Sequence, residues 1–323
     1  MNDAKTSTTA YAPGSIGNVG PGLDILGLAV AGAGDTVTVR RTGAAGVTIL
    51  DPGHPELPAD PERHTAALAA REVCRLAGAN EAIGMELRVQ KGLPLAGGQG
   101  GSAASAVAGA VAANAVLGQP LCSNEMIQAC LTAETLVAGR HADNIAPSLL
   151  GGLVLIRSLE PVEVISIPVP PDLWIVLAHP NQTLRTEEGR ARLPQQIPRD
   201  VALKQAAHVA ALVAGSASND LDLMGRALVD IIAEPARAPL LPGFVEAKAA
   251  ALLAGALGCS ISGSGPTAFA FAATEALALG VARAMGDAYG ALGINSHTRV
   301  TQPDLAGARL IDRDPQPEVI VCR

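Results

Sequence analysis

The sequence contains very few aromatic residues and no excess of positive charge. Aromatic side chains make up only 2% of the 323 residues, although 49% of the residues are hydrophobic. The core must therefore be built from Ala, Val, Leu and Ile, whose small side chains let helices and strands approach closely. The formal net charge is −7. Because no basic run is present to displace counterions from phosphates, we expect no nucleic-acid partner.

The patterns that mark secreted and membrane proteins are also missing. The five cysteines are scattered and include no Cys-x-x-Cys pair, which is unlike a secreted disulfide framework and typical of a reducing cytosol. Gly, Pro and charged residues interrupt every apolar run before it could span a bilayer. The N-terminal residues show no basic segment followed by an apolar one, so we expect no export signal. These absences predict a cytoplasmic protein without a membrane partner.

Helical and extended patterns are mixed along the chain. Alternation of apolar and polar residues predicts a hairpin and further strands, at 35–50, 85–91, 153–157, 162–167 and 173–178. Apolar periodicity predicts helices at 62–77, 221–233, 244–257 and 275–290. Between the last two helices, residues 258–272 are typical of a strand, a glycine-rich turn and a second strand. Helices and strands do not alternate strictly, so we expect an α+β fold.

The length of the chain indicates two domains rather than one core. A proline-rich patch at 167–172 marks the region of the boundary. We assign residues 1–160 to an N-terminal domain and residues 161–323 to a C-terminal domain.

The strongest chemical signal is the glycine-rich segment 94–105. Four of the five positions 97–101 are glycine, so the backbone can wrap closely around a ligand and direct its N–H groups toward it. An Ala-rich helix follows, and we expect Ser102 to cap its N-terminus. Helix N-termini carry unpaired N–H groups and a partial positive charge. The segment therefore predicts a nucleotide phosphate site, with an ordinary glycine-rich turn as the alternative.

Two common nucleotide motifs do not fit this segment. Gly98, Gly100 and Ala103 satisfy the dinucleotide fingerprint, but residues 116–120 offer no acidic side chain for a ribose and no surrounding βαβ unit is evident. A Walker loop ends in Gly-Lys-Ser or Gly-Lys-Thr, whereas this loop ends in Gly-Gly-Ser.

The loop instead resembles the GHMP kinase motif Pro-x-x-x-Gly-Leu-Gly-Ser-Ser-Ala, from which it departs at Gln99 and Gly101. Further segments are similar to the homoserine kinase family in particular, and they occur in the family's order along the chain, at 12–30, 141–152, 186–194 with 234–244, and 260–267. One departure is Leu23, which replaces the usual Phe.

The resemblance implies a two-domain GHMP kinase fold, with a ribosomal-S5-like N-terminal domain and a ferredoxin-like C-terminal domain, often in a homodimer. It implies phosphorylation of L-homoserine on the way to threonine, with ATP and Mg²⁺ as cofactors. The implied nucleotide contacts are Pro94, Gly97, Gly98, Gly100, Gly101, Ser102, Ala103 and Ala104. Ser102 and Glu134 are the implied Mg²⁺ ligands, and Mg²⁺ prefers such oxygen donors.

The resemblance also implies a pocket for the amino acid. Arg190 and Arg237 suit its carboxylate, because a guanidinium group binds a carboxylate in a two-pronged geometry, and Asp24 suits its ammonium group. The remaining implied pocket residues are His141, Thr186, Gly263 and Ser264, while the groups around the reacting hydroxyl are Asn18, Asp143 and Asn144. The nearby Arg192 is an alternative to Arg190.

Several alternatives stay open. The hydroxyl proton could be removed by an Asp, or the site could act by stabilising the transition state around Asn144. Residues 63–65, Arg-His-Thr, stand where the family often has an Asn before a helix, so the adenine contacts are undetermined. Other functions are a GHMP kinase for another alcohol, such as mevalonate, and a non-catalytic nucleotide- or metabolite-binding protein on the same fold.

Overall fold

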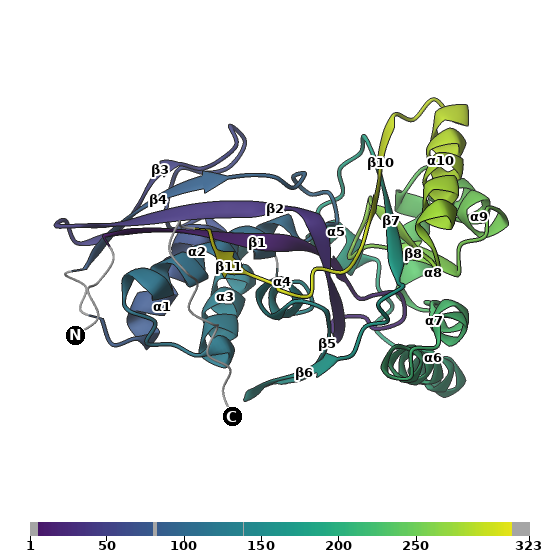
Figure 1. Cartoon of the computed structure of the whole chain (residues 1–323), viewed down its shortest axis with the longest axis horizontal. Coiled ribbons are helices and arrows are strands. Elements are labelled where there is room, and N and C mark those ends of the chain that lie inside the picture. Colours follow the sequence, from purple (N-terminus) through teal and green to yellow (C-terminus); the bar gives the residue numbers. More distant parts are fainter. Residues whose placement is uncertain (1–5, 80–82, 138, 312–323) are drawn as a thin grey trace.

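The computed structural model describes residues 6–79, 83–137 and 139–311, which form two β-sheets with helices packed against them (Figure 1). The first sheet comprises β1 (Ser7–Gly17), β2 (Leu26–Thr42), β3 (Gly46–Asp51), β4 (Gly84–Gln90), β5 (Leu153–Leu159), β6 (Val162–Ile167) and β11 (Arg309–Leu310). Its strand order is β11-β1-β2-β4-β3, and β5 extends it from β2 and carries β6.

Four helices cover one face of this first sheet (Figure 1). They are α1 (Thr65–Leu76), α2 (Gly101–Val116), α3 (Ser123–Val137) and α4 (Ile145–Leu150). Nearly every side chain of α2 is buried. At Gly109 an added Cβ would lie 2.6 Å from the Ala66 carbonyl oxygen of α1. The expected core of small aliphatic side chains is present here, and it allows this close contact between α1 and α2.

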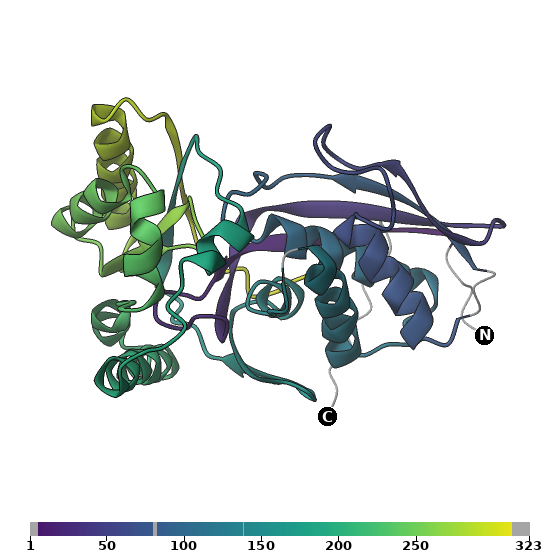
Figure 2. The same ribbon diagram turned by 180° about the vertical axis from the view of Figure 1, so that it is seen from behind.

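The second sheet is antiparallel and has the order β10-β7-β9-β8. Its strands are β7 (Trp174–Pro180), β8 (Gly258–Ile261), β9 (Ala268–Ala272) and β10 (Ser296–Thr301). Helices α9 (Phe244–Leu253) and α10 (Glu275–Ala291) pack against it. The long helix α6 (Arg199–Ala217) and the short helix α7 (Leu221–Ala227) lie together below them in both views (Figure 2). Phe244, Phe269 and Phe271 are all buried in this half of the chain.

A third group of buried side chains joins the two sheets. It combines Ile16 and Leu26 from the first sheet with Ile175 and Phe269 from the second. Leu212 of α6 packs in the same group. The α+β prediction with two halves is confirmed, and this shared core fixes the end of β1 against the second sheet.

The predicted hairpin at 35–50 is wrong in its pairing. Strands β2 and β3 both form, but β4 lies between them, antiparallel to β2 and parallel to β3. The alternating pattern predicts a strand and its buried face but cannot tell which neighbour it pairs with.

Two predicted helix boundaries are also wrong. Ser102 does not cap α2, because Gly100 is the capping residue, with a φ of 68°. The predicted helix 221–233 ends at Ala227. The Asp230 carboxylate then accepts backbone N–H groups of residues 232–234, which starts the separate helix α8 (Ala233–Arg237). An acidic side chain that bonds to local backbone N–H groups competes with a continuous helix.

β6 lies beyond the expected boundary at 160/161, yet it pairs with β5 of the first sheet. The division of the chain at 160/161 stays a prediction. Within the three described ranges, none of the helices has the length and apolar character needed to cross a membrane.

Candidate active site

A cavity of about 460 Å³ lies between the first turn of α2 and the turn that joins β8 to β9. The short helix α5 (Thr186–Ala191) and α8 contribute to its wall. Nearly all of the residues named from the sequence line it: Asn18, Asp24, Pro94, Gly97, Gly98, Gly100, Gly101, Ser102, Ala103, Glu134, His141, Asp143, Asn144, Thr186, Arg190, Arg237, Gly263 and Ser264. Ala104 does not line it, because its side chain is in the core and its N–H donates to the Gly100 carbonyl.

Residues 94–101, which we call the phosphate loop after the role predicted from the sequence, form one end of the cavity. Gly98 and Gly100 have φ angles of 73° and 68°, in the left-handed region that favours glycine. An added Cβ at Gly100 would lie 2.2 Å from Ser15 Oγ. Glycine is therefore needed there both for the backbone conformation and for space. The loop leads directly into the N-terminus of α2, where the helix dipole favours an anion.

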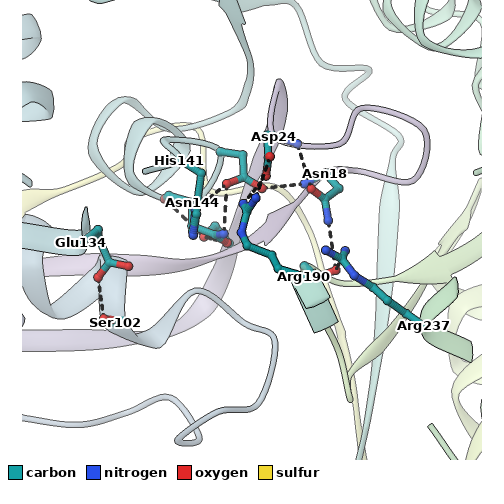
Figure 3. Close-up of polar contacts among 11 residues, drawn as sticks. Asn18, Asp24, Ser102, Glu134, His141, Asn144, Arg190 and Arg237 are labelled. Carbon is teal, nitrogen blue, oxygen red and sulfur yellow. Dashed lines mark hydrogen bonds and ion pairs between the residues drawn. The ribbon is translucent and has the colours of Figure 1, made fainter. Parts of the chain in front are cut away.

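Ser102 and Glu134 meet at this end of the cavity (Figure 3). The Ser102 hydroxyl donates to Glu134 Oε1 at 2.5 Å. Burial raises the pKa of Glu134, and the Ser102 hydrogen bond offsets this only in part. Among the residues that the structure describes, no group of three or more His, Cys, Asp and Glu side chains could hold a metal ion. One carboxylate and one hydroxyl still fit Mg²⁺, which takes few protein oxygens when phosphates are present.

Asn144 lies where the phosphate loop meets the end of β1. Its Oδ1 accepts a hydrogen bond from Ser15 Oγ at 3.0 Å. An added Cβ at Gly17 would lie 2.6 Å from Asn144 Nδ2, and one at Gly100 would lie 2.9 Å from Asn144 Oδ1. Two glycines thus leave room for this amide, which lies between the two ends of the cavity.

Asp143 organises the neighbouring polar groups. Its Oδ2 accepts the Asn18 backbone N–H at 3.0 Å, and its Oδ1 lies 3.1 Å from His141 Nδ1. Burial lowers the pKa of His141, but the hydrogen bond and charge of Asp143 outweigh burial, so the pKa is raised overall. His141 Nε2 is buried without a partner among the described residues. With Nδ1 donating to Asp143, this Nε2 can accept a hydrogen bond when the ring is neutral and donate one when the ring is protonated, so it is free to contact a ligand in the cavity.

The opposite end of the cavity carries the charged residues named for the amino acid. Arg190 and Asp24 form a two-pronged ion pair, with N–O distances of 2.6 and 3.1 Å. Arg190 Nε is buried and has no partner in the described part of the chain. Arg192 is exposed and does not line the cavity, so the structure brings Arg190 and not Arg192 to the site.

Arg237 is only 2% exposed. Its Nη1 donates to the Gly263 carbonyl at 2.9 Å, and Asn18 Nδ2 donates to the same oxygen at 3.0 Å. Burial lowers the pKa of Arg237, and the nearby charge of Arg190 lowers it further. Two guanidinium groups brought this close favour an anionic ligand between them.

Sequence reasoning missed Lys91, which also lines the cavity. Its ammonium pairs with the buried Asp35 and donates to the Gly101 carbonyl and to Ser105 Oγ, at 2.8 and 2.9 Å. An added Cβ at Gly101 would lie 3.4 Å from this ammonium group. The only signal in the sequence was a lysine at the end of the strand that precedes the loop.

His64 is the residue before α1, within the segment 63–65 where the family often has an Asn. Its Nδ1 accepts the Ala66 N–H and caps the helix, and its Nε2 lies 3.2 Å from the Pro52 carbonyl. Both ring nitrogens are thus engaged within the protein. Residues 57–58 and 63–65 nevertheless line this side of the cavity.

Known protein families match both halves of the chain. The model "GHMP kinases N terminal domain" matches residues 64–152, and "GHMP kinases C terminal" matches residues 209–291. The chain is 42% identical to a homoserine kinase of Chlorobium phaeobacteroides (strain BS1), over 88% of this chain and 93% of that protein. The chain belongs to the homoserine kinase family. A homoserine kinase of Arabidopsis thaliana is 41% identical, over 95% of this chain and 85% of that protein.

The fold of this homoserine kinase family member agrees with a solved structure. The crystal structure of homoserine kinase from Cytophaga hutchinsonii matches with a TM-score of 0.91 and 39% identity, and covers 96% of this chain and 99% of that chain. The expected GHMP kinase fold is therefore confirmed. Gln99, which departs from the general GHMP motif, contacts Thr267, with Nε2 3.4 Å from its hydroxyl.

Proposed function

We propose that this protein transfers the γ-phosphoryl group of ATP to the hydroxyl of L-homoserine, and so forms O-phospho-L-homoserine for threonine biosynthesis. One observation carries the proposal: a single cavity holds the phosphate loop at one end and the charged groups of Asp24, Arg190 and Arg237 at the other. A triphosphate fits the first end, and a zwitterionic amino acid fits the second.

We place Mg²⁺ at Ser102 and Glu134. When bound there with the nucleotide, it would neutralise charge on the phosphates. The protein itself supplies mainly position and electrostatic stabilisation in such reactions. Glu134 is buried, so its charged form is favoured by a cation and disfavoured without one.

Asn144 takes the position next to the reacting hydroxyl in this proposal. It adjoins Gly100 of the phosphate loop and Gly17 of the substrate side, so its amide lies where phosphate and alcohol would meet. Asp143 already accepts a hydrogen bond from the backbone N–H of Asn18 and contacts His141. We therefore assign Asp143 to orienting the hydroxyl, and attribute the rate to stabilisation of the transition state rather than to a dedicated base.

We assign the remaining polar groups of the cavity to binding the amino acid. Its carboxylate would lie between the guanidinium groups of Arg190 and Arg237, and its ammonium group would face Asp24. His141 Nε2 and Arg190 Nε, both buried without a partner in the described residues, would gain one. Thr186 and Ser264 complete the wall. We also propose that the protein acts in the cytoplasm as a homodimer, as the family resemblance implies.

The test is ADP release from ATP on addition of L-homoserine, followed in a coupled assay. We expect turnover with L-homoserine and little with mevalonate or with homoserine analogues that lack the amino group. Turnover of a simple alcohol at a similar rate would favour another GHMP kinase, for which Asp24 has no use. Nucleotide binding without turnover of any alcohol would favour a non-catalytic binding protein.

A further inference from the structure

Three consecutive carbonyl oxygens of the phosphate loop are each held by a donor outside the loop. The hydrogen bonds are Thr267 Oγ1 to Gly97 O at 2.5 Å, Ser262 Oγ to Gly98 O at 2.6 Å, and Ser15 N to Gln99 O at 3.1 Å. Ser262 follows β8 and Thr267 precedes β9, so two of the three donors lie in the turn that joins these strands of the second sheet.

These bonds determine where the loop's N–H groups point. In a planar trans peptide, the carbonyl of one residue and the N–H of the next point in opposite directions. The described cis peptides are elsewhere, at 160–161 and 265–266. Fixing the carbonyls of residues 97–99 therefore directs the N–H groups of residues 98–100 the other way. Gly98 and Gly100 line the cavity, and we infer that a phosphate would lie on the side to which these N–H groups point.

The two hydroxyls are well fixed. Ser262 and Thr267 are both 0% exposed, so bulk water does not compete for their hydrogen bonds. The oxygen of Thr267 is also approached by His179 Nδ1 at 3.0 Å and by Gln99 Nε2 at 3.4 Å. With these two groups as donors, the Thr267 proton is left for the Gly97 carbonyl. The side chain of Gln99 thus contributes to the same arrangement.

We propose that Ser262 and Thr267 are positioning residues for the nucleotide, which turn the peptide planes of the phosphate loop so that its N–H groups face the triphosphate. The proposal deepens the proposed function and rests on it, since it takes a nucleotide to be the ligand of this loop. Between the two residues, the Gly263 carbonyl binds Arg237 and Asn18. One short turn therefore supports the loop from one side and the amino-acid pocket from the other.

The experiment compares Ser262→Ala and Thr267→Val with matched variants that lose a similar hydroxyl elsewhere. Ser260→Ala removes a buried hydroxyl on β8 that donates to Glu234. Thr301→Val removes a hydroxyl that donates to the Ala31 carbonyl. ADP binding is measured by calorimetry without homoserine, beside the KM values for ATP and homoserine and the melting temperature.

Loss of one such hydrogen bond should weaken ADP binding and raise the ATP KM by roughly 10-fold in Ser262→Ala and Thr267→Val. The homoserine KM should change much less, and Thr267→Ser should restore ADP binding. Ser260→Ala and Thr301→Val should lower the melting temperature without weakening ADP binding.

The proposal is overturned if the two site variants lose only thermal stability, as the matched variants do, while ADP binding is retained. It is equally overturned if Thr267→Ser binds ADP as poorly as Thr267→Val. If Thr267→Val does not fold, Ser262→Ala and Thr267→Ser decide between these outcomes. A wild-type protein that binds ADP but does not phosphorylate homoserine would contradict the proposed function and leave this comparison valid.

Discussion

Arg190 and Asp24, 166 positions apart in the sequence, form an ion pair in which two guanidinium nitrogens each contact one carboxylate oxygen, in the pocket that we assign to the substrate. The pair is only partly buried, since the side chains are 33% and 38% exposed. The structure therefore holds together two groups that we assign to opposite ends of a zwitterion. A zwitterionic ligand that contacts both can replace their mutual contact without leaving a charge unpaired.

Asp24→Asn should raise the homoserine KM by roughly 100-fold, because it removes the charge that faces the ammonium group and also frees Arg190. Arg190→Ala should have a similar effect, and the double variant should be less than additive because the two residues interact directly. Steady-state kinetics of the four proteins measure this. Additive effects would show that the two side chains act independently in substrate binding.

Arg237→Ala should raise the homoserine KM by roughly 100-fold, with a far smaller effect on the ATP KM. The side chain is buried next to Gly263, and Lys cannot reproduce its planar two-pronged geometry. Arg237→Lys should therefore recover little. Arg192→Ala, at an exposed position on the adjacent segment, is the control. Equal increases in both KM values would instead make Arg237 a structural residue.

Ser102→Ala should lower kcat and raise the Mg²⁺ concentration required for half-maximal activity. The Ser102 hydroxyl and the Glu134 carboxylate are the two groups that we assign as Mg²⁺ ligands. Without the hydroxyl, Glu134 would be the remaining protein ligand. The measurement is a Mg²⁺ titration at saturating ATP and homoserine. An unchanged kcat and an unchanged Mg²⁺ requirement would refute the role of Ser102.

Glu134→Gln should stabilise the metal-free protein at neutral and alkaline pH while reducing activity. Burial raises the pKa of Glu134 above the ordinary value of 4.5, so the folded state binds more protons than the unfolded state between these two pKa values. Stability therefore falls as the pH rises through that window. Urea unfolding at several pH values, with chelator present, should show the advantage of the Gln variant shrinking as the pH falls toward 4.5. An advantage that does not depend on pH would contradict this origin.

The glycine-rich turn and the helix after it could be predicted from the sequence because the signal is local: adjacent glycines followed by a helix describe one continuous piece of backbone. Binding of a phosphate by this loop stays a prediction. The charged residues of the amino-acid pocket came from the family resemblance, since nothing near Arg190 indicates that it would meet Asp24. Lys91 was missed for the same reason, because its partner Asp35 lies 56 positions away. Long-range partners of single polar residues leave no periodic pattern.

The errors in secondary structure have a similar origin. Periodicity reports the buried face of a strand or helix, so β2, β3 and the start of α7 were expected. It does not report which strand comes between two others, nor that Asp230 would bond to the N–H groups after it. Ser102 is a favourable capping residue by type, yet Gly100, in a left-handed conformation, is the capping residue, two positions earlier than the side-chain chemistry suggested.

The close approach of Gly109 to the Ala66 carbonyl limits which side chains this enzyme can accept at position 109. The helix that presents the phosphate loop rests directly on its neighbour, with no side chain between the two backbones. A methyl group at position 109 would force α1 and α2 apart. Because α2 begins at the glycine-rich loop, this shift would also move the loop. The placement of the glycine-rich loop therefore depends on a position in the helix core that does not line the cavity.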